Sequence, residues 1–95
     1  MKNSGTLSIV ATPIGNPEDI TLRAIEVLKF VDAVVCEEAK PGSTLLKRLG
    51  IADKELVLLN EHNEAEMAAE LLMRLLNGEN LALISDCGTP IFADP

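Results

Sequence analysis

The sequence predicts an α/β fold, a three-layer domain with a mainly parallel sheet and helices on both faces. Four short apolar runs alternate with amphipathic helical patterns, in the order β-α-β-α-β-α-β. Each run is continuously apolar, which is typical of strands that are buried on both faces. Parallel strands need crossover connections, so this alternation favours right-handed crossovers through the intervening helices.

We expect strands at residues 7–11, 33–36, 56–59 and 81–85. The first expected helix has an apolar stripe made of Leu22, Ile25, Leu28 and Val31. Asn16, Asp19 and Thr21 are alternative N-caps for this helix, because their side-chain oxygens can accept a backbone hydrogen bond.

The second expected helix is shorter. It would be capped by Ser43 or Thr44 and stopped by Gly50. The third has a stripe made of Met67, Leu71, Leu72 and Leu75, and we expect this stripe and Met73 to lie in the core. It ends before Gly78, which can adopt the left-handed conformation that often follows a helix.

The composition indicates one modest domain that lacks the signature of a nucleic-acid-binding surface. The chain has 95 residues, 47% of them hydrophobic, and a formal net charge of −7. This charge opposes non-specific attraction to phosphate backbones by the segment itself. Cys36 and Cys87 lack metal-ligand spacing and the chain has one histidine, so we expect reduced thiols and no metal site. Without a signal-peptide or membrane-span pattern, a cytoplasmic protein that does not bind membranes is expected.

Two unusual loops follow predicted strands. The first contains Thr12-Pro13-Ile14-Gly15-Asn16, and the second contains Asp86-Cys87-Gly88-Thr89-Pro90. Both fall at the carboxyl edge of the predicted sheet, where α/β proteins bind ligands. Neither contains a phosphate-binding glycine pattern, and the acidic residues after the first loop would repel an anion, so a ligand with little negative charge is favoured. The alternative is that both are stiff turns that bind nothing.

Acidic residues and the single histidine provide further candidates at the same edge. Glu37 and Glu38 follow the second strand, but neighbouring strand residues point to opposite faces, so we expect at most one of them to face a cleft. His62 follows the third strand and is a candidate general base. Alternatively, these acids and His62 are simply solvated, with Asn60, Glu61 or Asn63 capping the next helix.

Several motifs taken in order resemble one family of enzymes. They are "LSIVATPIGNPEDITLRAIEVLKFVD", "LLKRLGI", "EHNE" and "LALISDCGTPIFADP". Together they are similar to the amino-terminal half of the small-subunit ribosomal RNA methyltransferase I family, which belongs to the tetrapyrrole methylase superfamily. The resemblance covers essentially the whole chain.

The resemblance implies that residues 1–95 form the amino-terminal tetrapyrrole-methylase-like domain of a two-domain class III methyltransferase, without its second domain. It implies the cofactor S-adenosyl-L-methionine in a cleft between the domains, contacted here by the two loops. The implied cofactor-binding residues are Pro13, Gly15, Asp86, Gly88, Thr89 and Pro90. Glu37 is the implied catalytic residue, as a base or as a group that orients the substrate.

The resemblance also implies a function for the full-length protein, namely 2′-O-methylation of a cytidine in small-subunit ribosomal RNA, with the RNA or the ribosomal subunit as its partner. A homodimer is considered too, because one wall of the cleft would be exposed. We expect residues 1–95 alone to be inactive, since half of the cleft would be missing. Methylation of a tetrapyrrole carbon and non-catalytic ligand binding remain the alternatives.

One segment departs from the family pattern. Members usually read Glu-Asp-Thr-Arg-His-Thr where this chain has Glu37-Glu38-Ala39-Lys40-Pro41-Gly42. Lys40 keeps a positive charge, but it cannot form the two parallel hydrogen bonds of an arginine. The departure therefore leaves open an acceptor other than the usual cytidine.

Overall fold

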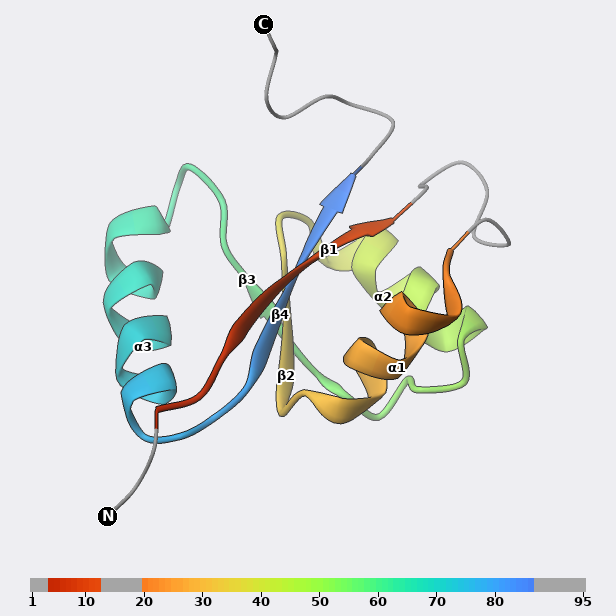
Figure 1. Ribbon diagram of the computed structural model, residues 1–95. Coiled ribbons are helices and arrows are strands. Elements are labelled where there is room, and N and C mark those ends of the chain that lie inside the picture. Colours follow the sequence, from red (N-terminus) through yellow and green to blue (C-terminus); the bar gives the residue numbers. More distant parts are fainter. Residues whose placement is uncertain (1–3, 13–19, 87–95) are drawn as a thin grey trace, which may run out of the picture.

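The computed structural model describes residues 4–12 and 20–86, in which four strands alternate with three helices (Figure 1). In chain order these elements are β1 (Leu7–Thr12), α1 (Leu22–Phe30), β2 (Ala33–Cys36), α2 (Ala39–Arg48), β3 (Glu55–Leu58), α3 (Glu64–Leu76) and β4 (Leu81–Asp86). This order confirms the predicted alternation of strands and helices.

The strands form one parallel sheet in the order β1-β4-β2-β3. The last strand is thus inserted between the first two, where it pairs with both. Leu83 of β4 is in register with Ile9 of β1 on one side and with Val35 of β2 on the other. The predicted parallel sheet is confirmed.

Helices cover both faces of the sheet, which also confirms the prediction. In Figure 1, which looks toward the β1 edge, α1 and α2 lie on one side of the sheet and α3 lies on the other. The core under α1 and α2 consists of Val10, Leu28, Val31, Val34, Leu46, Ile51 and Ala82. The core under α3 consists of Ala33, Val35, Val57, Leu71 and Leu81.

Burial of both faces was expected for every strand, and this is wrong for β1 in the described residues. Val10 and Thr12 of β1 are buried on the α1 side, whereas Leu7 and Ile9 are 49% and 68% exposed. The physical reason is that α3 packs on the cores of β2, β3 and β4 but leaves this face of the edge strand without a covering helix.

The helix stripes are confirmed in part. Thr21 caps α1, because its Oγ1 accepts a hydrogen bond from the Ala24 backbone N at 3.1 Å. Leu28 and Val31 are buried, but Leu22 is 79% exposed because it lies in the first turn, beyond the sheet. On α3, Leu71 is buried, whereas Leu72 and Met73 are more than half exposed, so the expectation that they lie in the core is wrong here.

Helix α2 begins earlier than expected, at Ala39, so Ser43 and Thr44 are not its caps. Pro41 fits in the first turn because the backbone N–H groups there have no partner within the helix. Gly42 is buried against β2, and a Cβ at this position would lie 2.7 Å from the Sγ atom of Cys36. The absence of a side chain at Gly42 therefore sets how closely α2 approaches the sheet.

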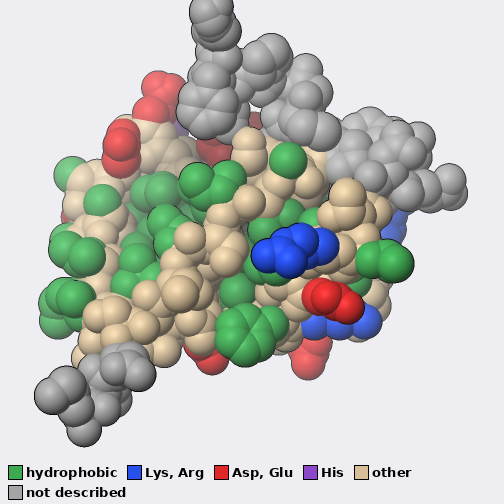
Figure 2. Space-filling model, viewed as in Figure 1, with side chains coloured by type: hydrophobic (Ala, Val, Ile, Leu, Met, Phe, Trp, Pro, Cys, Tyr) green, Lys and Arg blue, Asp and Glu red, His purple; other side chains and the backbone are tan. Residues whose placement is uncertain are grey.

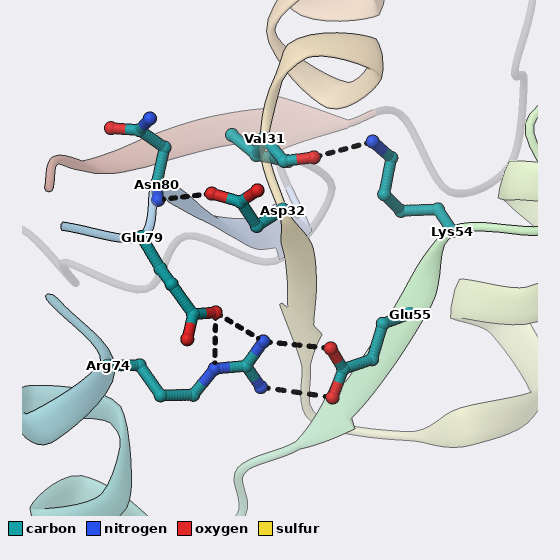
Figure 3. A network of polar contacts seen from close by, with 7 residues as sticks. All are labelled: Val31, Asp32, Lys54, Glu55, Arg74, Glu79 and Asn80. Atoms are coloured by element: carbon teal, nitrogen blue, oxygen red, sulfur yellow. Dashed lines mark hydrogen bonds and ion pairs between the residues drawn. The ribbon is translucent and has the colours of Figure 1, made fainter. Parts of the chain in front are cut away.

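Polar contacts tie the elements together at the amino edge of the sheet (Figure 3). Arg74 of α3 donates two hydrogen bonds to the Glu55 carboxylate of β3, at 2.8 and 3.0 Å, and also pairs with Glu79 at 2.7 Å. Asp32 accepts a hydrogen bond from the Asn80 backbone N at 2.8 Å. Lys54 donates to the carbonyl oxygens of Lys29 and Val31 at the end of α1. The turns before β2, β3 and β4 are thus fixed by side chains.

We expect Gly42→Ala to lower the free energy of unfolding of the intact protein by about 1 kcal/mol. Overpacking against Cys36 costs about 1–3 kcal/mol, and the higher helix propensity of alanine offsets part of this cost. In a Cys36→Ala background the sulfur is absent, so the same change should become neutral or stabilising. Urea unfolding of the four proteins checks this, and an equal effect of Gly42→Ala in both backgrounds would contradict it.

We expect Glu55→Gln to destabilise the intact protein by up to about 1 kcal/mol at pH 7, because Glu55 is 55% exposed and solvent weakens its pairing with Arg74. Hydrogen bonding from Arg74 lowers the pKa of Glu55 below its ordinary value of 4.5. The carboxylate therefore contributes stability above that value and loses it as the pH falls through the lower, folded-state pKa.

The measurement is the free energy of unfolding from pH 7 down to pH 3, with Glu26→Gln on the exposed side of α1 as the control. The difference between wild type and Glu55→Gln should shrink at the acidic end of this range. A difference that stays constant with pH would show that the ion pair does not stabilise the fold.

Candidate active site at the carboxyl edge

The carboxyl ends of β1 and β4 lie side by side. Thr12 and Asp86, the last residues of these strands, are register partners. The segments that follow, residues 13–19 and 87–95, therefore leave the sheet from adjacent positions. This confirms that the two strands preceding the unusual loops end at one edge, which is the ligand-binding edge in parallel α/β sheets.

Thr12 is the buried polar residue at this edge, with 2% of its surface exposed. Its hydroxyl donates a hydrogen bond to the carbonyl oxygen of Ser85 on the neighbouring strand, at 3.4 Å. The contact holds the ends of β1 and β4 together just where the two loops begin. The sequence analysis did not separate Thr12 from its loop, although a hydroxyl residue between an apolar run and a proline was a usable signal.

Glu37 is exposed and directly follows β2. It comes two residues after Val35, which pairs with Leu83, and Thr12 and Asp86 lie three residues beyond the same level on their strands. The structure therefore places Glu37 at the edge where the two loops begin. Glu38 occupies the N-cap position of α2, and its side chain makes no capping hydrogen bond.

Cys36 lies beside these residues but is not suited to act as a nucleophile. Its side chain is buried, and its thiol donates to the carbonyl oxygen of Glu38 at 3.1 Å. Burial raises the pKa of the Cys36 thiol above its ordinary value of 9.0, so the thiolate is disfavoured. The contribution of Cys36 is to fix the turn that carries Glu37.

The segment between β3 and α3 is fixed by asparagine side chains. Asn63 accepts a hydrogen bond from the Asn60 backbone N at 2.8 Å and donates one to the carbonyl oxygen of Leu58 at 3.0 Å. Asn60 in turn accepts from the His62 backbone N at 2.9 Å. Asn63 occupies the N-cap position but makes no capping hydrogen bond through its side chain, so its expected role as a cap is replaced by holding this turn. The His62 side chain is exposed.

Most predicted cofactor-binding residues lie outside the described residues, namely Pro13, Gly15, Gly88, Thr89 and Pro90. Asp86 is described only through its backbone, as the last residue of β4. Their roles therefore remain predictions. The described part of the edge carries the exposed carboxylates of Glu37, Glu38 and Glu61. Such an edge favours a ligand with a cationic centre over a polyphosphate, because like charges repel.

We expect Asn63→Ala in the intact protein to speed amide hydrogen exchange at Asn60 by about tenfold, which corresponds to about 1.4 kcal/mol for one lost hydrogen bond. Asn63→Asp is the matched variant, since it keeps the acceptor for Asn60 and loses the donor to Leu58. It should leave exchange at Asn60 closer to wild type. Equal exchange in all three proteins would contradict the proposed bracing of the turn.

The search for membrane spans covered residues 4–12 and 20–86, and none of their helices is long and apolar enough to cross a bilayer. Among proteins of known identity, the chain is 50% identical over 94 residues to Ribosomal RNA small subunit methyltransferase I of Leptospira biflexa, covering 99% of this chain and 39% of that protein. It is 47% identical over 93 residues to the protein of the same name from Escherichia coli O157:H7, covering 98% and 32%.

The protein of that name from Xylella fastidiosa is 44% identical over 95 residues, with 100% of this chain and 34% of that protein covered. The chain thus spans about a third of the length of the curated relatives it matches. Residues 6–95 match the family described as Tetrapyrrole (Corrin/Porphyrin) Methylases. This match includes all four strands and all three helices of the described structure, and the chain belongs to the tetrapyrrole methylase family.

Proposed function

We propose that the intact protein is an S-adenosylmethionine-dependent methyltransferase that acts in the cytoplasm on the 2′-hydroxyl of a cytidine in small-subunit ribosomal RNA. The observation that carries this proposal is the similarity, along essentially the whole chain, to proteins named Ribosomal RNA small subunit methyltransferase I. The parallel sheet, with two loop-bearing strands ending side by side, is the kind of scaffold that such a reaction needs.

The residues at the carboxyl edge fit this donor. S-adenosylmethionine would supply an electrophilic methyl group on a positively charged sulfur. The carboxylates at the edge suit a positive charge, and the hydrogen bond from Thr12 to Ser85 holds the two loops at a fixed spacing. Pro13, Gly15, Asp86, Gly88, Thr89 and Pro90 are the residues proposed to hold the donor. A rigid first loop would reduce the entropy lost on binding.

Glu37 is proposed to act on the acceptor. Its carboxylate would accept the proton of the ribose hydroxyl as the oxygen attacks the methyl carbon, so that the alkoxide never forms free in solution. Glu37 is exposed and therefore accessible to an acceptor, and the Cys36–Glu38 hydrogen bond restrains the turn that carries it. Restraint of this kind favours catalysis because much of the acceleration in a displacement reaction comes from positioning.

The acceptor is proposed to be presented by the small ribosomal subunit, and the protein is proposed to act as a homodimer. With a net charge of −7, this segment is not expected to bind the RNA backbone strongly. Binding of the ribosomal subunit would then depend mainly on other parts of the intact protein.

The experiment uses the full-length protein, methyl-labelled donor and unmodified small ribosomal subunits, followed by mapping of the labelled nucleotide. Label on one cytidine ribose supports the proposal. Donor binding without label in RNA would overturn the RNA assignment and direct attention to tetrapyrrole acceptors. Failure to bind either the donor or its demethylated product would overturn the methyltransferase assignment itself.

We expect Glu37→Gln to lower kcat of this methylation by about 10²-fold or more, the usual contribution of a general base, with donor affinity unchanged. Glu26→Gln, on the exposed side of α1, is the matched control and should retain the wild-type rate. Single-turnover rates and donor titration separate the two effects. An unchanged rate in Glu37→Gln would exclude Glu37 as the base.

A further inference from the structure

An apolar trough lies between α3 and the β1 edge of the sheet. Its floor carries Leu7 and Ile9 of β1, and its wall carries Leu72 and Leu76 of α3, which are each 56% exposed. Figure 2 shows hydrophobic side chains gathered on the side of the molecule where α3 lies, between that helix and the sheet. A continuous apolar surface of this kind marks an interaction site.

The wall of the trough is the flank of α3 that faces away from β3. Arg74 reaches Glu55 of β3, which fixes the orientation of the helix. At 3.6 residues per turn, residues two positions apart are separated by about 200°, so Leu72 and Leu76 lie nearly opposite Arg74. They therefore flank the part of the sheet that contains β4 and β1. At the amino edge the trough is closed, because Gly5 donates a hydrogen bond to the Leu75 carbonyl oxygen at 2.7 Å.

The topology shows which connection would pass over this trough. The crossovers from β1 to β2 and from β2 to β3 run in one direction across the sheet, with α1 and α2 on one face. The crossover from β3 to β4 runs in the opposite direction, and α3 lies on the opposite face, as right-handed connections require. A further right-handed connection from β4 to the outer side of β1 would continue in that direction and place its helix on the same face as α3.

The free edge of β1 calls for such a strand. In the described residues β1 pairs with β4 alone, and its sequence LSIVAT has neither a charge nor a proline. An apolar edge strand without these features promotes association with another strand. The same connection would thus cover both the trough and the edge.

We propose that the trough binds an amphipathic helix from the same polypeptide, beyond Pro95, which connects β4 to an additional parallel strand beside β1. The chain covers only 39% and 32% of two relatives, so a protein of their length has polypeptide to supply these elements. A helix of about three turns matches the length of the trough, with its apolar residues spaced three and four apart. This inference is independent of the proposed methylation.

The experiment places a photo-crosslinking benzoylphenylalanine at position 9 or 72 of the full-length protein, with position 66 on the outward side of α3 as the control. Variants are compared after their circular dichroism and melting temperature match those of the wild type. Mass spectrometry should identify crosslinks from positions 9 and 72 to peptides beyond residue 95 of the same chain, unchanged on dilution. Crosslinks within residues 1–95, between two copies, or to solvent alone would overturn the proposal.

Thiol labelling provides a second readout that needs no bulky side chain. Ile9→Cys and Leu72→Cys in the full-length protein should be labelled at least about tenfold more slowly than Glu66→Cys, because a covered face must open before it reacts. Labelling at the same rate as Glu66→Cys would show that the trough is open to solvent. Protection that disappears on dilution would assign the trough to a second copy, which also overturns the proposal.

Discussion

The insertion of β4 between β1 and β2 is the constraint on which the rest of the structure depends. Leu81 and Ala82 of this strand are fully buried, one toward α3 and the other toward α1 and α2. The strand therefore joins both cores and pairs on both edges. A shift of β4 by one residue would exchange its two faces and separate Thr12 from Asp86. The geometry of the candidate site thus follows from the register of one central strand.

Much of the fold could be predicted from the sequence because its patterns are local. Apolar runs, helix stripes, Thr21 as a cap and glycines at helix ends each depend on a few neighbouring residues, and Gly50 and Gly78 do adopt positive φ angles of 78° and 92°. The start of α2 could not be predicted in this way. It depends on a proline tolerated in the first turn and on the contact between Gly42 and Cys36, residues that come together only when helix and strand pack.

The candidate site was less predictable than the fold. The side-by-side ends of β1 and β4 follow from strand order, which a sequence pattern does not specify. Leu22, Leu72 and Ile9 are apolar and correctly spaced for a core, yet they are exposed in the described structure, because spacing shows which side chains share a face but not what covers that face. Similarly, the hydrogen bonds of Asn63 could be recognised as bracing rather than capping only from the folded turn.

The polar network of Arg74 lies at one edge of the sheet, and the candidate active site lies at the other. Substitutions at the network can change how firmly the elements are joined without altering any group near the proposed donor. Conversely, the loops that leave β1 and β4 can diverge in sequence while the opposite edge keeps the strands in place. In such an arrangement, new acceptor specificities can evolve, or be engineered, on a scaffold whose stability is adjusted independently.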